Sequence, residues 1–273
     1  MNTTDLLSQK LEQFRTDKTS NPFAIRNIRD LVITELTDEI WMVTACDSDG
    51  GIGPKPLDTF HTSAYDLGRF GMRVPLMEIL ASGAEPILTA DLLTVEMEPT
   101  GKEIIRGVTD ELHEAGVNPN TAVTGSTEDN VKTVQTGMGV VITGLIHKNN
   151  FRPGKSLAGD VVAVIGIPKS APEYKVECND PEITSPSTVR ELLALEFIHE
   201  ILPVGSKGIK HESGELAKTA GLSFNYNQNP EISITKSGGP STCCLVSLSP
   251  DNYNRLKDKI TKPVSLIGEL REK

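Results

Sequence analysis

The sequence predicts an α+β protein built from two domains. Helical and strand patterns are mixed without the strict β-α-β order of a doubly wound sheet. The chain of 273 residues is long enough for two domains of ordinary size. Residues 149–159 are rich in Pro, Gly and polar residues and show no periodicity, which is typical of a linker. We therefore expect one domain over 1–150 and a second over 151–273.

Composition excludes several classes of protein. Hydrophobic residues make up 37% and charged residues 23%, as in globular proteins. The net charge of −10 argues against a nucleic-acid binder, which needs Lys and Arg for phosphates. No apolar run approaches ~18 residues and the N-terminus is polar, so we expect neither a membrane span nor a signal peptide. The four cysteines form no C-x-x-C pair, which favours a reduced, cytoplasmic protein without a zinc site.

Periodicity predicts the elements of the first half. We expect a helix over 5–17, a hairpin of strands 30–36 and 40–46, and a helix over 63–83 that Pro75 kinks or splits. Gly83 stands at a favourable position to end that helix. The remaining expected elements are a strand over 86–97, a helix over 99–115, and strands over 121–124 and 139–146, the last buried on both faces.

The second half has a similar mixture. A strand is expected over 160–167, before a loop rich in Pro, Ser and Glu. Apolar spacing then predicts three helices and three strands. The helices are expected over 187–200, 210–220 and 251–260, and the strands over 231–235, 241–248 and 263–270.

The stretch from Cys46 to Phe60 is the strongest candidate for a functional site. Asp47 and Asp49 lie two residues apart and suit a hard cation such as Mg²⁺, which prefers oxygen ligands. The glycines that follow can present backbone N–H groups to an anion, and Lys55 suits a phosphate. Together they predict a Mg-nucleotide site. The alternative is a plain turn, because Asp and Gly are common turn residues and neither common phosphate motif is present.

Six segments, taken in order, resemble those of a known superfamily. It comprises aminoimidazole ribonucleotide (AIR) synthetase, thiamine-monophosphate kinase, selenophosphate synthetase and the hydrogenase-maturation dehydratase. The segments are D-G-G-I-G-P-K (49–55), M-E-I-L-A-S-G-A-E-P (77–86), T-G-S-T-E (124–128), G-D-V-V (159–162), S-G-G (237–239) and P-V-S-L-I-G-E (263–269). The resemblance implies a two-domain AIR synthetase-like fold with a C-terminal α/β sandwich. It also implies a homodimer whose N-terminal sheets join into a barrel, and Mg-ATP-dependent phosphoryl transfer.

Departures from the family pattern narrow the choice of member. Ser126 replaces an acid, and Pro240-Ser241 follows S-G-G where thiamine-monophosphate kinases have Glu-Asp. The segment 211–217, H-E-S-G-E-L-A, lacks the aspartates of their D-x-S-D-G-L-A. Three segments instead look like the α-ribazole kinase of cobalamin lower-ligand salvage, which phosphorylates the 5′-hydroxyl of α-ribazole. They are 47–58 (D-S-x-x-x-I-G-x-K-P-x-D), 95–107 (V-E-M-E-P-T-G-K-E-I-I-R-G) and 124–130 (T-G-S-T-E-D-N).

The residues and the resemblance together give a candidate site. The expected Mg²⁺ ligands are Asp47, Asp49 and Glu78, where Glu78 replaces the family's Asp. The expected ATP contacts are Gly51, Gly53, Lys55, Gly125, Ser126 and Thr127. Asp49 and Asp91 are the catalytic candidates, and His61 and His211 are candidates for the substrate. Each has an ordinary alternative: a turn or cap for the loop residues, a solvated lysine, a helix-face glutamate, or a hydrogen-bonded structural aspartate in the case of Asp91.

Three functions remain open at this point. The first is a small-molecule kinase, and the second is an ATP-dependent synthetase or cyclo-ligase on the same fold. The third is a nucleotide-binding protein without catalysis, which the departures at 211–217 and 240–241 allow. The pair Asp47 and Asp49 argues against the third, since two close carboxylates repel each other unless a cation pairs them.

Overall fold

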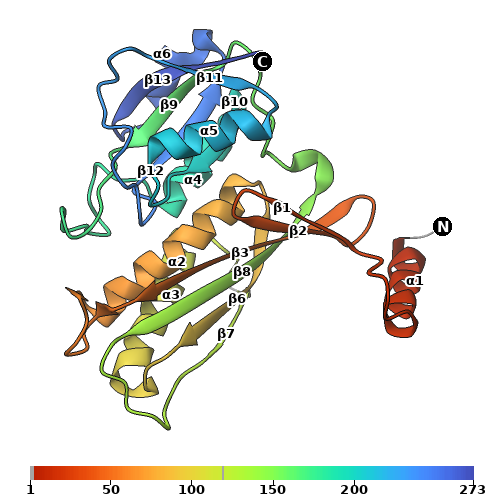
Figure 1. Ribbon diagram of the computed structural model, residues 1–273, viewed down its shortest axis with the longest axis vertical. Helices are drawn as coiled ribbons and strands as arrows, with labels where there is room; N and C mark the ends of the chain where they lie inside the picture. Colours follow the sequence, from red (N-terminus) through yellow and green to blue (C-terminus); the bar gives the residue numbers. More distant parts are fainter. Residues whose placement is uncertain (1–2, 119) are drawn as a thin grey trace.

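The computed structural model describes residues 3–118 and 120–273, which form two sheets, each with its own helices (Figure 1). Strands up to His147 build the N-terminal sheet, and strands after Asp160 build the C-terminal sheet. Helix α1 (Thr3–Thr16) lies to one side, next to the β1–β2 hairpin. No helix in the described part of the chain has the length and apolar character needed to cross a membrane.

The N-terminal sheet is open and has six strands in the order β1-β2-β3-β8-β6-β7. Only β6 and β7 run parallel; the other neighbours are antiparallel. A separate short pair, β4 (Ile52–Gly53) and β5 (Phe60–His61), lies in the loop after β3. The strands of the sheet are β1 (Ala24–Ile28), β2 (Leu31–Glu35), β3 (Ile40–Gly50), β6 (Glu85–Leu93), β7 (Ala122–Ser126) and β8 (Gly137–His147).

Helices α2 (Ala64–Ala81) and α3 (Lys102–Glu114) cover only one face of this sheet (Figure 1). Residues of β8 therefore alternate: Val140 and Ile142 are buried under the helices, whereas Val141 and Thr143 on the other face are half-buried. The expectation that this strand is buried on both faces is wrong. Its apolar residues on the second face lie on a surface that helices leave uncovered.

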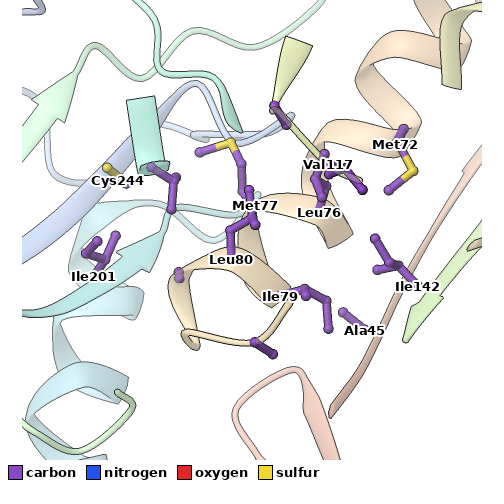
Figure 2. Packing of buried hydrophobic residues seen from close by; sticks show 14 of the residues in the cluster. Ala45, Met72, Leu76, Met77, Ile79, Leu80, Val117, Ile142, Ile201 and Cys244 are labelled. Carbon is purple, nitrogen blue, oxygen red and sulfur yellow. The ribbon is translucent and has the colours of Figure 1, made fainter. Parts of the chain in front are cut away.

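Helix α2 is the central element of the core, because it packs on both sheets (Figure 2). Ile79 lies on the side of Ala45 and Ile142 of the N-terminal sheet, while Met77 lies on the side of Cys244 of the C-terminal sheet. Pro75 was expected to kink or split this helix, but α2 continues through it. Burial on two sides offsets the cost of about 3 kcal/mol that an internal proline brings.

Two glycines allow α2 and α3 to approach closely. A Cβ on Gly68 of α2 would lie 2.1 Å from the carbonyl oxygen of Ile104, and a Cβ on Gly107 of α3 would lie 2.2 Å from that of Tyr65. Any larger residue would force the helices apart. The close crossing in turn brings Arg69 and Arg73 of α2 onto Glu111 of α3, which accepts hydrogen bonds from both.

The C-terminal sheet has five antiparallel strands in the order β10-β12-β9-β13-β11. Helix α5 (Ile209–Thr219) packs on one face, while α4 (Pro186–Leu193) and α6 (Tyr253–Lys259) pack on the other. This gives the layered α+β half that was expected. The strands are β9 (Val161–Gly166), β10 (Ile198–Pro203), β11 (Ser223–Tyr226), β12 (Cys243–Leu248) and β13 (Val264–Arg271).

Several expected boundaries are wrong for identifiable reasons. The helix expected over 187–200 stops at Leu193, because residues 198–203 pair with β12 as an edge strand. The strand expected over 231–235 does not form, and 223–226 takes the edge beside β13 instead. The helix expected from Pro99 starts at Lys102, after a π-turn over Met97–Gly101 that also shortens the preceding strand.

Candidate active site

Asp47 and Asp49 lie in strand β3 rather than in a loop, since pairing with β8 continues to Gly50. Alternate residues of a strand point to the same face. Both carboxylates therefore point to the face that α2 covers, and Asp49 lies beside Gly71, where a Cβ would be 3.1 Å from its Oδ2. Because Asp47 and Asp49 are two residues apart in a strand, their carboxylates lie on the same face of the sheet as a pair.

Three more acids from separate elements are linked to this pair through the charge of Asp30, and we call the resulting cluster of five acids the acidic cleft. Asp30 ends the β1–β2 turn, Glu78 lies on α2, and Glu212 lies on α5 of the C-terminal half. Their charges act on one another: those of Asp30 and Glu212 both act on Glu78, and that of Asp30 acts on Asp47. The acidic cleft consists of Asp30, Asp47, Asp49, Glu78 and Glu212.

Burial and mutual repulsion make this cluster unfavourable when every acid is ionised. Burial, with the charges of Asp30 and Glu212, raises the pKa of Glu78 to about 8. Burial and the charge of Asp47 raise the pKa of Asp49 to about 6. Burial also raises the pKa of Asp47 and of Glu212. A neighbouring cation would relieve this repulsion.

Arg29, whose charge acts on Glu78, is already engaged elsewhere. Its guanidinium forms an ion pair with buried Glu200 and donates to Thr219 Oγ1 at 3.1 Å. The acidic cleft therefore keeps an excess of negative charge. Its hard oxygen donors suit Mg²⁺, which prefers such ligands and keeps several waters. Among the described residues, no group of three or more Asp, Glu, His or Cys side chains is arranged to hold a metal ion by itself.

Asp91 marks a second part of the site, at the edge of the same sheet. It is 3% exposed, burial raises its pKa, and its Oδ2 has no hydrogen-bond partner among the described residues. It lines a cavity of about 200 Å³ between β6, β7 and α3. The cavity, which we call the edge pocket, is lined by Asp91, Met97, Ile105, Val123, Thr124, Gly125, Ser126 and Thr127.

The edge pocket brings together residues that sequence analysis assigned separately. Gly125 faces Asp91 directly, and a Cβ there would lie 1.6 Å from Asp91 Oδ1. The register of the sheet places Asp47, Val140, Asp91 and Gly125 in one row across β3, β8, β6 and β7. One strand separates Asp47 from Asp91, so their backbones are about 10 Å apart. The acidic cleft and the edge pocket thus share one face of one sheet.

In the loop after β3, the residues that were expected to bind phosphate already have structural roles. The Lys55 side chain is only 13% exposed, and its ammonium group forms an ion pair with Glu96. Although burial opposes it, hydrogen bonds from Lys55 and Thr100 lower the pKa of Glu96 to about 2. Gly51 and Gly53 have φ values of 69° and 146°, which favour glycine. These glycines shape the loop, and Lys55 already has an anionic partner.

The two histidines lie at the border of the site. His61 ends β5 and is exposed, and its charge acts on Asp58. His211 is exposed on α5, and its charge acts on Glu212. Glu212 itself is buried in the acidic cleft. The segment 211–217, which lacks the aspartates of the thiamine-monophosphate kinases, thus supplies a glutamate to the cluster, one residue after His211.

Asp30 and Glu212 were missed as site residues by sequence analysis. Asp30 follows no motif and stands next to a turn residue, Arg29, with a φ of 55°. Glu212 was noted only as part of a segment without aspartates. The usable signal was Glu212 itself, an acid between apolar positions of an amphipathic helix, which predicts a buried carboxylate.

Residues 27–146 match the family model described as AIR synthase related protein, N-terminal domain. This part of the chain, which is less than half of it, is therefore similar to the N-terminal domain of AIR synthase-related proteins. A comparison with the curated proteins finds no match.

Solved structures share the fold over most of the chain. Thiamine-monophosphate kinase from Stenotrophomonas maltophilia K279a is 14% identical, with a TM-score of 0.61 over 98% of this chain and 93% of the other. The hydrogenase maturation protein HypE of E. coli is 14% identical, with a TM-score of 0.61 over 84% and 80%. Phosphoribosylformylglycinamidine synthase II from Thermotoga maritima is 17% identical, with a TM-score of 0.60 over 92% of this chain and 42% of the other. These similarities support the AIR synthetase-like fold.

Proposed function

We propose that this chain transfers the γ-phosphoryl group of ATP to a hydroxyl of a small molecule, because residues 27–146 match the model of the AIR synthase-related N-terminal domain. The observation that carries the proposal is the acidic cleft, to which both halves of the chain contribute. Uncompensated carboxylates of this kind do not stabilise a fold. They fit a site that is completed by Mg²⁺ and nucleotide phosphates. Similar structures were solved with ATP, for T. maritima PurL, and with AMPPCP and TMP, for AaThiL.

The proposed roles follow from position. Asp47, Asp49 and Glu78 would bind Mg²⁺ only together with ATP phosphate oxygens and water, because no three described acids are arranged to hold it alone, and Asp30 and Glu212 would lie at its border. Bound Mg²⁺ would offset the negative charge of the ATP phosphates and of these acids. The backbone and hydroxyls of Gly125, Ser126 and Thr127 would hold the nucleotide next to the edge pocket. In this assignment Lys55 orients Glu96 and the loop, and reaches phosphate only if that ion pair opens.

The transfer itself needs a positioned hydroxyl and an acceptor for its proton. The hydroxyl oxygen would attack the γ-phosphorus, the bond from that phosphorus to the ADP oxygen would break, and the hydroxyl proton would pass to a carboxylate. Asp91 is suited to accept it, because its buried Oδ2 is free and burial favours the protonated form. Asp49 is the alternative acceptor, with a pKa of about 6.

Our preferred acceptor is α-ribazole, on the basis of the segments 47–58, 95–107 and 124–130. All three pack together at one end of the N-terminal sheet. Lys55 pairs with Glu96, and Asp129 accepts a hydrogen bond from the Met97 backbone at 3.0 Å. Segments that carry one resemblance and also build one surface support a shared substrate. The alternative is a reaction like that of thiamine-monophosphate kinase, or of an ATP-dependent synthetase.

A homodimer is part of the proposal. The uncovered face of the N-terminal sheet exposes apolar side chains that a monomer would leave in water, among them Leu88 and Leu92, which are 41% and 48% exposed. Pairing of two such faces would close the barrel that the resemblance implies.

The test is mass spectrometry after incubation with Mg-ATP and, separately, α-ribazole, thiamine monophosphate and formylglycinamidine ribonucleotide. We expect phosphorylated α-ribazole with the wild type and none with Asp47→Asn/Asp49→Asn, which should also lose Mg-dependent ATP binding. A dehydrated or cyclised product with ATP consumption would assign a synthetase instead. Unchanged Mg-ATP binding by the double variant would refute the placement of the site.

A further inference from the structure

A second cavity, separate from both parts of the candidate site, lies where the two halves of the chain join. It has a volume of about 580 Å³, within the range of small-molecule sites. Its lining comes from the end of α2, from the connecting segment and from α4 and β10. We call it the junction pocket; the residues used below are Phe151, Arg152, Lys155, Arg190 and His199.

The junction pocket is basic in a chain whose net charge is −10. Arg152, Lys155, Arg190 and His199 all line it, together with one acid, Glu85. Glu85 is fully engaged, because its two oxygens accept hydrogen bonds from Arg190 at 2.5 and 2.8 Å. The charges of Arg152 and Lys155 are thus not offset by any carboxylate paired with them among the described residues.

Two of these groups are held in place before any ligand arrives. Arg152 donates to the carbonyl oxygens of Ile198 at 3.1 Å and Leu193 at 3.2 Å, and burial lowers its pKa. His199 Nδ1 lies 2.7 Å from the buried carboxylate of Asp160. That contact fixes the imidazole ring and leaves Nε2 as its free nitrogen. Pre-oriented groups of this kind lose little conformational entropy on binding.

From this geometry we propose that the junction pocket binds a small phosphorylated anion. Arg152 and Lys155 supply charge, and the side-chain amides of Asn149 and Asn150 supply hydrogen-bond donors. His199 adds a donor at Nε2 when its ring is protonated on both nitrogens, a form that the contact with Asp160 stabilises. A phosphate group needs several converging donors of this type and a cationic environment. The volume leaves room for the organic part of a metabolite of nucleotide size.

A ligand bound in the junction pocket would contact both halves of the chain. Gly83 and Glu85 belong to the N-terminal half, whereas Arg190 and His199 belong to the C-terminal half. Gly83 lies just after Ser82, the C-cap of α2, and Glu78 of the acidic cleft lies on that helix five residues before Gly83. The proposal does not depend on the function proposed above, because no residue of the acidic cleft lines this pocket.

The single tryptophan of the chain offers a direct readout. Trp41 packs edge-to-face on Phe151, with ring centroids 5.4 Å apart, and Phe151 lines the junction pocket. A ligand that contacts Phe151 changes the surroundings of the Trp41 indole. We would titrate the full chain with inorganic pyrophosphate in EDTA, to exclude Mg²⁺, and record Trp41 emission.

We expect a saturable change with the wild type and with two controls. The control Lys259→Glu makes the same charge reversal on an exposed residue of α6, and Asp47→Asn/Asp49→Asn alters the acidic cleft. Lys155→Glu reverses an exposed charge at the pocket and should weaken binding at least about tenfold, the value of one charge-assisted hydrogen bond. His199→Gln should weaken it less, because the amide keeps one donor.

Three outcomes would overturn the proposal. The first is the absence of a saturable change in the wild type. The second is an equal response of Lys155→Glu and Lys259→Glu, which would mean that pyrophosphate binds elsewhere. The third is loss of the response in Asp47→Asn/Asp49→Asn with retention in Lys155→Glu, which would place the ligand in the acidic cleft.

Discussion

Replacing Glu78 by Gln should remove a pH-dependent destabilisation that the acidic cleft causes. The pKa of Glu78 rises from 4.5 to about 8 through burial and the charges of Asp30 and Glu212. A carboxyl whose pKa is higher in the folded chain favours folding while it is protonated in both states. That contribution is complete below a pH of about 4.5 and is lost as the pH rises to about 8.

The magnitude follows from the two values. At ~1.4 kcal/mol for each pKa unit, the rise amounts to at most about 5 kcal/mol, of which about 4 kcal/mol falls between about pH 5 and about pH 8.5. For a chain of this size we expect a loss of roughly 10 °C in Tm over that range. Gln is nearly isosteric with protonated Glu and has no charge to lose. Glu78→Gln should therefore match the wild type near the acid end and exceed its Tm by roughly 10 °C at the alkaline end.

The assay is thermal unfolding in EDTA across this pH range, with Glu191→Gln as a matched control on the exposed side of α4. The control removes a carboxylate outside the acidic cleft and should follow the wild type at every pH. If the wild type and Glu78→Gln lose Tm in parallel as the pH rises, Glu78 does not lie in an acidic, buried environment. Addition of Mg²⁺ at the alkaline end should stabilise the wild type more than Glu78→Gln.

Two further substitutions test how the halves and helices are held together. Arg29→Met leaves the buried carboxylate of Glu200 without its ion-pair partner, so we expect about 3–5 kcal/mol of destabilisation in urea unfolding; a loss below about 1 kcal/mol would show that the pair is solvated. Gly107→Ala would place a Cβ 2.2 Å from the Tyr65 carbonyl oxygen, so a fall of at least about 2 kcal/mol is expected despite the better helix propensity of Ala. A stabilised Gly107→Ala variant would contradict the close crossing of α2 and α3.

Sequence reasoning predicted the parts of the fold that local pattern determines. The stripe of Ile104, Ile105, Val108 and Leu112 predicted helix α3, and the apolar runs around 37–39 predicted the β2–β3 hairpin. Sequence reasoning failed where pairing with a distant strand determines the structure of a segment. Residues 198–200 were expected to end a helix, but residues 198–203 form β10 because β12 offers an open edge.

The candidate site likewise has residues that local pattern predicts and residues that only the packing of distant segments brings together. Asp47 and Asp49 could be found from spacing alone, because neighbours at i and i+2 share a face whatever the rest of the chain does. Asp30 and Glu212 are 182 residues apart in sequence and act on Glu78 only after both sheets have packed on α2. Gly68 and Gly107 were unremarkable as helix residues, and their role appears only in the crossing of two helices.

The position of α2 gives the acidic cleft a property that no single residue has. Glu78 belongs to the helix that both sheets share, Asp47 to the N-terminal sheet, and Glu212 to the C-terminal half. A cation that lowers the repulsion among these acids binds most tightly when α5 and β3 are close together. Its binding therefore favours the arrangement in which they are close over one in which they are further apart. The junction pocket lies at the other border between the halves, near the end of α2. A ligand in the junction pocket contacts both halves as well. If the spacing of the halves differs between the free and bound states, linkage requires that the cation in the acidic cleft and the anion in the junction pocket change each other's affinity.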